Sequence, residues 1–316
     1  MRTYLCSTDL FIFGQTPAPV KWTKAIYKPA LLALLGAIFF AMTSSARATE
    51  TGFLNRTVKV GNETYHYQVY VPREWNKRHK WPVILFLHGA GERGDDGFVQ
   101  TEVGLGGAIR RHVDRFSAIV VMPQCRKARW WTEEAMQQQA LNAFEQSVKE
   151  FNGDRDRLYL TGLSMGGYGT WSIASKHPGK FAALVPVCGG VRPPARVPVP
   201  DADRATDPNI DPYAVTAQKV GKTPVWIFHG GADPVVPPDE SRKMNEALKA
   251  AGGNVKYTEY EKVGHNSWDK AYAEPELMKW MLGHSLKAVD STASRGAGKE
   301  SGRRRNLARS FSTQPD

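Results

Sequence analysis

Cysteine is scarce in this chain of 316 residues, with only three, Cys6, Cys125 and Cys188. So few cysteines exclude the dense disulfide framework of small secreted domains. The longest apolar run, residues 30–42, is too short for a comfortable membrane span, and no second run follows it. A metal-ligand cluster, a Walker loop and a dinucleotide fingerprint are also missing, so the sequence implies neither a metal ion nor a cofactor.

The excess of basic residues does not indicate a nucleic-acid-binding protein. The chain has 42 Lys and Arg against 31 Asp and Glu, a net charge of +11. Residues 1–48 and residues 287–316 each carry +4, which leaves +3 for everything between them. We therefore expect no nucleic-acid partner for the central body.

The first 48 residues resemble an export signal. Three lysines precede the apolar run, and Ala46-Arg47-Ala48 supplies an A-x-A cleavage site. We expect cleavage after Ala48, a secreted or periplasmic protein and no stable membrane span in the mature form; a retained signal anchor is the alternative. The long prefix 1–19 points to a true start further down, such as a codon at Val20.

The other end, residues 287–316, is rich in Ser, Gly and Arg and nearly free of apolar residues. Such a segment cannot bury enough apolar surface to fold, so we expect a disordered basic tail. The run Arg303-Arg304-Arg305 suits either solvation or contact with an acidic polymer or anionic lipid.

Between the ends, apolar β-branched runs alternate with helix-like stretches. The predicted strands are 65–71, 83–87, 118–122, 158–160, 182–187, 225–228 and 255–260. The predicted helices are 134–151, 167–176, 240–250 and 275–282. This alternation is typical of an α/β fold with one mostly parallel sheet covered by helices on both faces, and it predicts one catalytic domain over residues 49–286. Six prolines in 191–212 predict a surface loop beside the site rather than a helical lid.

Cys125 and Cys188 each follow a predicted buried strand. An oxidising compartment favours a disulfide, but cysteines on strands that are not neighbours cannot bring their α-carbons within about 7 Å. We expect two buried thiols.

The sequence Gly162-Leu163-Ser164-Met165-Gly166 lies between a predicted strand and a predicted helix. A nucleophilic serine on a sharp strand-to-helix turn requires this setting, because small neighbours let its hydroxyl project freely. Ser164 is therefore the candidate nucleophile, and a glycine-rich turn with an idle serine is the alternative.

A serine hydroxyl needs a base to take its proton and an acid to orient that base. Asp233 follows the strand 225–228 and His265 follows the strand 255–260, which gives the chain order Ser, Asp, His. Asp269 is the competing acid. The other rivals are given structural roles, His229 as a satisfied histidine at a strand end, His284 in a terminal helix, and Asp239 with Glu240 as helix caps.

An oxyanion hole needs two aligned donors. The backbone N–H of Met165 is one, and that of Ala90, in the loop after strand 83–87, is the other, with Gly91 as its alternative. We expect His88 to stabilise this loop and Glu92 to pair with Arg93.

The ordered set of motifs resembles a known group of enzymes. The motifs are His88 to Gly94, Pro123-Gln124-Cys125, Gly162 to Tyr168, Cys188-Gly189-Gly190, Asp233 with Val235-Val236-Pro237, and Gly264 to Asp269. Over residues 65–282 the chain is similar to bacterial phospholipase/carboxylesterase-type α/β hydrolases, the "predicted peptidase" group, close to feruloyl esterases and polyhydroxybutyrate depolymerases. The resemblance implies a serine esterase with the triad Ser164, Asp233 and His265, and strands that keep Cys125 and Cys188 apart. The Pro-rich segment after Gly190 is longer than in the pattern of this group.

Tryptophans near the site bear on the substrate. Trp131 and Trp268 are candidates for stacking on a sugar or phenolic ring, with packing under the loops as the alternative, while Tyr168 and Trp171 are expected in the core.

The leading hypothesis is an exported serine carboxylesterase acting on short-chain acyl, feruloyl or acetyl-sugar esters, small or polysaccharide-linked. A serine peptidase of the prolyl-oligopeptidase-like type and a lysophospholipase are the enzymatic alternatives. A binding protein on an inactivated hydrolase scaffold, tethered by its basic tail, is the alternative of another class. The sequence does not determine the oligomeric state.

Overall fold

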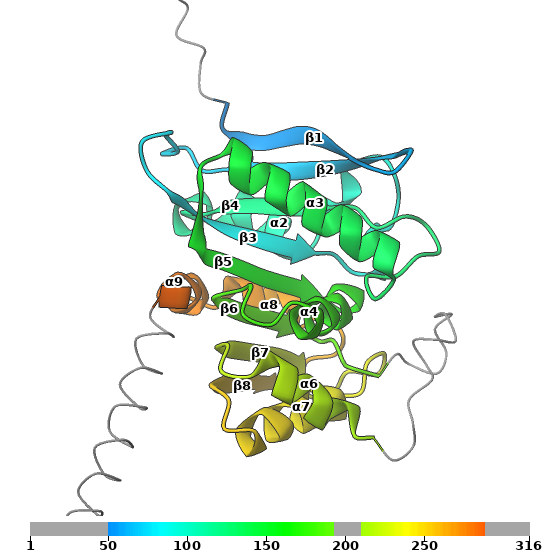
Figure 1. The fold of residues 1–316 in the computed structure, drawn as a ribbon. Coiled ribbons are helices and arrows are strands. Elements are labelled where there is room, and N and C mark those ends of the chain that lie inside the picture. Colours follow the sequence, from blue (N-terminus) through cyan, green and yellow to red (C-terminus); the bar gives the residue numbers. More distant parts are fainter. Residues whose placement is uncertain (1–49, 193–209, 288–316) are drawn as a thin grey trace, which may run out of the picture. The chain divides into compact units, whose positions relative to one another are not determined.

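The computed structural model describes residues 50–192 and 210–287, and its centre is an eight-stranded sheet (Figure 1). The strand order is β1-β2-β4-β3-β5-β6-β7-β8. The pairs β1–β2 and β2–β4 are antiparallel, and all later neighbours are parallel. The strands are β1 (Gly52–Val60), β2 (Glu63–Val71), β3 (Trp81–Leu87), β4 (Ile119–Pro123), β5 (Gly153–Leu163), β6 (Ala183–Val187), β7 (Val225–Gly230) and β8 (Val255–Tyr260). The predicted mostly parallel sheet is confirmed.

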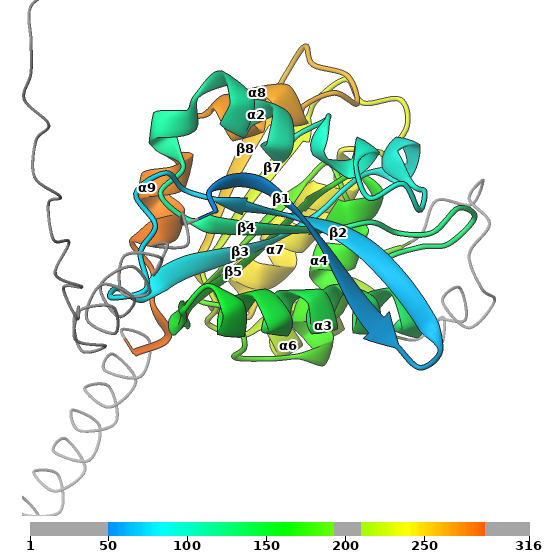
Figure 2. The ribbon, with the colours of Figure 1, turned by 90° about the horizontal axis from the view of Figure 1, so that it is seen from above.

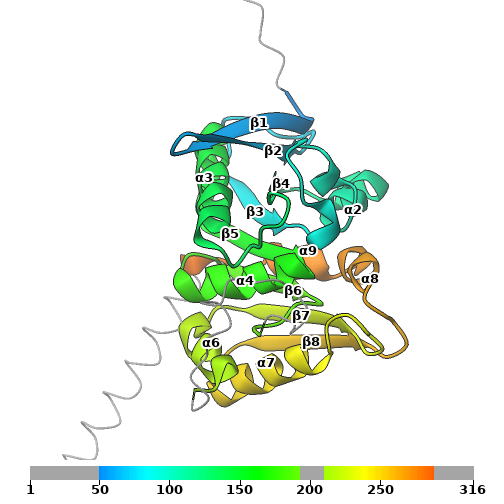
Figure 3. The ribbon, with the colours of Figure 1, turned by 90° about the vertical axis from the view of Figure 1, so that its right-hand side faces the viewer.

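Helices cover both faces of this sheet. One face carries α3 (Glu134–Glu150), α4 (Met165–Lys176), α6 (Pro212–Val220) and α7 (Asp239–Ala250). The other carries α2 (Leu105–Arg111), α8 (Trp268–Ala273) and α9 (Leu277–Leu282). Figure 2 shows the two helical layers on either side of the strands, and Figure 3 shows α3 and α2 on opposite faces.

The alternation of buried side chains in β3 shows how the sheet separates two cores. Val83, Leu85 and Leu87 pack towards α3 and α4, whereas Ile84 and Phe86 pack towards α2 and α8. Successive side chains of a strand point to opposite faces, so a strand buried on both faces must be apolar throughout. This is why the interior strands could be predicted from continuous apolar runs.

The strand β1, which the sequence pattern does not predict, is an edge strand whose side chains are mostly exposed or half-buried. It pairs with β2 along its whole length, from Gly52 opposite Val71 to Val60 opposite Glu63. A two-residue turn, Gly61-Asn62, joins the strands, with Gly61 at φ +58°. Such a turn is a hairpin signal that favours glycine, and it could have revealed the strand.

Three short helices were also missed, α2, α6 and α8. The helix α6 begins at Pro212, where proline is tolerated because the first helical N–H has no intrahelical acceptor, and the Asp211 carboxylate accepts a hydrogen bond from the N–H of Tyr213 (2.9 Å). The rest of the predicted Pro-rich loop, residues 193–209, lies outside the described residues, as do the predicted signal segment and all but the first residue of the tail.

Cys125 and Cys188 are both buried and free, as predicted. They follow β4 and β6, which β3 and β5 separate in the sheet. Burial raises the pKa of the Cys188 thiol to about 12. Within the described ranges, no helix has the length and apolar character needed to cross a membrane.

Candidate active site

Ser164 stands at the carboxyl end of β5, directly before α4, on a strained turn. Its backbone adopts φ +53° and ψ −117°, a conformation that non-glycine residues rarely take up. The flanking glycines permit it, because a Cβ on Gly166 would lie 1.9 Å from the carbonyl oxygen of Leu87 and a Cβ on Gly162 would lie 2.3 Å from that of Gly166. The turn therefore has the geometry expected of a nucleophile elbow.

His265 bridges Ser164 and Asp233. Its Nε2 lies 2.9 Å from Ser164 Oγ, and its Nδ1 lies 2.7 Å from Asp233 Oδ2. In the neutral ring, the Nδ1 proton is donated to the carboxylate, so Nε2 is left to accept the serine proton. Ser164 and His265 are half-buried and open to solvent, whereas the Asp233 side chain is fully buried.

The sheet explains why residues so distant in sequence meet here. Ser164, Asp233 and His265 follow the carboxyl ends of β5, β7 and β8, which lie on one edge of the parallel sheet. After β3, the chain adds β4 on one side of that strand and then β5 on its other side. The strands β3 and β5 therefore flank the topological switch point of the sheet, where crevices form in α/β folds.

Asp233 is held as a carboxylate. Burial acts to raise the pKa of Asp233, but hydrogen bonds from His229, from His265 and from the N–H groups of Val236 and Val235 outweigh it and hold that pKa well below its usual range. An ionised acid at this position can stabilise an imidazolium on His265. The contact between His229 and Asp233 is not anticipated from the sequence, which predicts only a satisfied histidine at a strand end.

The competing acids are engaged elsewhere. Asp269 Oδ2 accepts a hydrogen bond from Asn266 (2.8 Å), and about half of its side chain is exposed. Asp239 pairs with Arg242 at 2.8 Å on α7. Glu240 accepts hydrogen bonds from the Tyr213 hydroxyl (2.6 Å) and from the N–H of Val191 (3.0 Å). None of the three contacts His265.

The loop after β3 lies against the elbow. A Cβ on Gly89 would lie 3.7 Å from the Cβ of Ser164, so the backbone passes close to the serine. Ala90 is the first residue of a short 3-10 helix and Met165 is the first residue of α4. The first N–H groups of a helix have no intrahelical acceptor, which leaves both suited to hold an oxyanion.

His88 and Trp131 support this loop. His88 accepts a hydrogen bond from the N–H of Cys125 at Nε2 (2.9 Å) and contacts the carbonyl of Gly89 through Nδ1 (2.6 Å). Burial lowers the pKa of His88 to about 4. The indole N–H of Trp131 donates to the carbonyl of His88 (2.9 Å), and the two rings pack edge to face at 5.1 Å.

Trp131 therefore differs from the expectation that it forms a stacking platform. Its side chain is fully buried between the loop and α4, where a Cβ on Gly169 would lie 2.5 Å from the Cβ of Trp131. A ring with no exposed face cannot stack on a substrate, so the alternative, packing under the loops, describes its place.

The expected pairing of Glu92 with Arg93 is wrong. Arg93 donates to the carbonyls of Ala90 (2.9 Å) and Arg129 (3.4 Å). The buried Glu92 Oε2 has no hydrogen-bond partner among the described residues, and burial raises the pKa of this carboxyl.

Trp268 lies beside the candidate base. Its ring packs perpendicular to that of His265, with the ring centres 5.4 Å apart, and it is half-buried. It therefore keeps some solvent exposure beside His265. Tyr168 and Trp171 are each 2% exposed, which confirms their place in the core.

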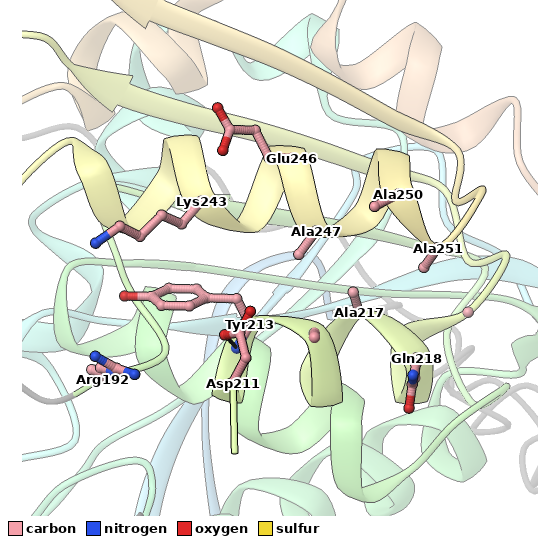
Figure 4. Close-up of a pocket in the computed structure, with 12 residues that line it drawn as sticks. Arg192, Asp211, Tyr213, Ala217, Gln218, Lys243, Glu246, Ala247, Ala250 and Ala251 are labelled. Atoms are coloured by element: carbon pink, nitrogen blue, oxygen red, sulfur yellow. Dashed lines mark hydrogen bonds between the residues drawn. The ribbon is translucent and has the colours of Figure 1, made fainter. Parts of the chain in front are cut away.

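A cavity of about 870 Å³ lies away from the triad, between α6 and α7 (Figure 4). Alanines from both helices form its floor, and Arg192, Asp211 and Lys243 stand at one end. No residue of the candidate site lines this cavity, so the volume of a cavity does not identify the active site here.

The sheet, the elbow and the hydrogen-bonded Ser–His–Asp arrangement define an α/β hydrolase of the carboxylesterase type. The pattern of the dienelactone hydrolase family matches residues 116–276, just over half of the chain. The chain belongs to the dienelactone hydrolase family.

Two curated relatives show how far this similarity reaches. An uncharacterized secreted protein of Arthroderma benhamiae is 26% identical over 227 residues, 65% of this chain and 23% of that protein. A putative carboxymethylenebutenolidase of Salmonella typhimurium is 30% identical over 116 residues, 36% of this chain and 37% of that protein. The chain thus spans about a quarter and about a third of these relatives.

Solved structures extend the comparison. A thermostable esterase is 32% identical with a TM-score of 0.62, covering 74% of this chain and 63% of that one. A ferulic acid esterase is 18% identical with a TM-score of 0.56, covering 74% and 99%. At that identity, the second likeness concerns the fold alone.

Proposed function

We propose that this protein is an exported serine carboxylesterase that cleaves carboxylic esters through a covalent acyl-enzyme. The observation that carries the proposal is the pair of hydrogen bonds made by His265, 2.9 Å to Ser164 Oγ and 2.7 Å to Asp233 Oδ2. A nucleophile, a base and an orienting acid within hydrogen-bond reach are what serine catalysis requires.

In acylation, His265 Nε2 takes the hydroxyl proton as Ser164 Oγ attacks the ester carbonyl carbon. The resulting oxyanion is held by the backbone N–H groups of Ala90 and Met165, while Asp233 stabilises the imidazolium. His265 then gives the proton to the departing alkoxide, the C–O bond breaks, and an alcohol leaves. Water repeats the sequence on the acyl-enzyme and releases the acid.

The surroundings favour a rigid oxyanion hole. His88 and Trp131 fix the loop that carries Ala90, and the strained turn fixes Met165 relative to Ser164. Donors fixed before the reaction need not reorganise as charge develops, and this is the basis of electrostatic stabilisation of the transition state.

For the substrate, we propose short-chain acyl, feruloyl or acetyl-sugar esters, small or polysaccharide-linked. The half-buried Trp268 beside His265 would contact an aromatic acyl group or a sugar ring. The name of one similar protein, the thermostable esterase at 32% identity, supports ester chemistry.

The test is hydrolysis by purified mature protein with Ser164→Ala as the control. The panel contains aryl esters of increasing acyl length, feruloyl and acetyl-sugar esters, a lysophospholipid and a peptide anilide. Ester cleavage that disappears in the variant would support the proposal. Cleavage of the anilide or the lysophospholipid alone would replace it with a peptidase or a lysophospholipase, and ester cleavage that persists in folded Ser164→Ala would refute it.

Export and domain organisation belong to the same proposal: a signal cleaved after Ala48, a catalytic domain over 49–286 and a basic tail over 287–316. The charge pattern of the first segment supports it, as does the name of the secreted fungal relative. N-terminal sequencing of the mature protein tests it, and a terminus upstream of Lys21 would contradict it.

A further inference from the structure

A second histidine, His229, contacts the candidate acid Asp233 in addition to His265. His229, at the end of β7, is fully buried, and its Nε2 lies 3.3 Å from Asp233 Oδ2 and 3.1 Å from the carbonyl oxygen of Val236. Its Nδ1 lies 2.6 Å from Ser241 Oγ, in the first turns of α7. The imidazole thus spans the loop that carries Asp233 and joins it to a helix.

The partners define which nitrogen of the neutral ring carries the proton. A carbonyl and a carboxylate can only accept, so Nε2 must donate to Val236 and Asp233. The Nδ1 atom is then an acceptor, and the Ser241 hydroxyl is the group that donates to it. The opposite tautomer would direct a lone pair at two acceptors, which a buried site does not tolerate.

We propose that His229 is a positioning residue for the acid of the triad, and that Ser241 fixes the tautomer it needs. This inference rests on the proposed function. The Ser241 hydroxyl donates to His229, and His229 donates to Asp233 Oδ2. His265 donates to the same oxygen and accepts from the Ser164 hydroxyl. With Oδ1 held by the N–H groups of Val235 and Val236, the carboxylate has little freedom to rotate.

The other carboxylates near His229 bind other residues, so Asp233 is the acid that His229 positions. Glu259 lies opposite His229 in the register of β7 and β8, but Arg242 binds its carboxylate at 2.6 and 2.9 Å. Glu240, next to Ser241, accepts from the Tyr213 hydroxyl and from the N–H of Val191. The carboxylate that faces the His229 ring from its own loop is that of Asp233.

Three variants test the proposal. His229→Leu removes the polar contacts of both ring nitrogens at similar volume, His229→Gln keeps an N–H donor near the position of Nε2, and Ser241→Ala removes only the group that sets the tautomer. Tyr159→Phe is the matched control, since this buried side chain loses another hydrogen bond, 2.8 Å from its hydroxyl to the carbonyl of His284. Each is measured for kcat and KM on an aryl ester, for its unfolding temperature, and for the downfield proton resonance of the His265–Asp233 hydrogen bond.

We expect His229→Leu to lower kcat about tenfold or more with KM nearly unchanged, the effect of losing one hydrogen bond to a charged group. Gln should restore most of kcat, Ser241→Ala should lower kcat severalfold, and the downfield resonance should broaden or shift in Leu and Ala. The control should lose only thermal stability.

The proposal is overturned if the loss of kcat simply parallels the loss of unfolding temperature in all four variants and His229→Gln retains no more kcat than His229→Leu. His229 would then be a structural histidine. If His229→Leu does not fold, an unchanged kcat and an unchanged resonance in Ser241→Ala would overturn it. The proposed function fails separately, through activity that persists in Ser164→Ala.

Discussion

Replacing Trp131 by Phe tests whether this residue supports the loop that carries Ala90, the proposed oxyanion-hole donor, or instead binds the substrate. The change removes the N–H that donates to His88 and leaves that carbonyl without its partner. A lost buried hydrogen bond between neutral groups costs about 1 kcal/mol, and the smaller ring leaves space in a fully buried position, so we expect about 2–3 kcal/mol of lost stability in total.

The catalytic effect should appear in kcat. Since Trp131 anchors the loop that carries Ala90, its loss should let this proposed oxyanion donor move, and loss of one such donor costs about 10²–10³ in kcat. A loosened donor costs less, so we expect about a tenfold fall in kcat, equal for acetyl and feruloyl esters, with KM little changed.

Chemical denaturation and steady-state kinetics on both ester types provide the assay, with Trp268→Phe as the comparison. Trp268 contacts His265 and is half-buried, so its variant should raise KM for feruloyl esters more than for acetyl esters. Unchanged stability in Trp131→Phe, together with a KM rise confined to feruloyl esters, would refute the reasoning and make Trp131 a substrate platform.

Further predictions follow from the buried groups. Asp233→Asn should lower kcat by about 10³–10⁴ while the protein stays folded, because an amide cannot hold His265 in the required tautomer; circular dichroism and kinetics check this. The pKa of Asp233 is lower in the folded protein than in the unfolded chain, where it is about 4, so the ionised carboxylate stabilises the fold above pH 4 and this stabilisation is lost as the pH falls below 4. The free energy of unfolding, measured with denaturant between pH 7 and pH 3, should therefore fall more steeply in the natural protein than in Asp233→Asn. Cys125 and Cys188 should resist alkylation in the native protein and react in denaturant, as counted by mass spectrometry, and rapid native labelling would contradict their burial.

Much of the fold could be predicted because buried parallel strands have an unambiguous pattern. The run over β8 was predicted with its observed bounds, and the runs of β3, β4 and β6 were predicted within two residues of theirs. The edge strand β1 escaped because exposed polar residues interrupt its pattern. The helix α2 escaped because it has seven residues and two of them are glycines, so it has too few turns and too little helix propensity to stand out.

The arrangement of the candidate site could be predicted to the extent that topology determines it. Ser164, Asp233 and His265 each follow a parallel strand, and such strand ends must share one edge of the sheet, so their meeting follows from the strand assignment. The role of Trp131 could not be predicted in this way. Whether a tryptophan in a loop faces solvent or the interior depends on which elements pack over it, here α4 through Gly169, and a local pattern does not contain that contact.

This difference explains why a sequence of this kind indicates the reaction more clearly than the substrate. The proposed reaction depends on groups held by buried contacts, namely Asp233 through His229 and two backbone N–H groups, and Ala90 through His88 and Trp131. Such contacts tolerate few residue types, so they appear in the sequence as motifs. Side chains that could meet a substrate, such as Trp268 and the exposed Val235 two residues after Asp233, have no comparable restriction. An exposed residue can change without breaking the fold, so substrate choice has to be measured on the ester panel, while the bond-cleaving groups can be inferred from the chain.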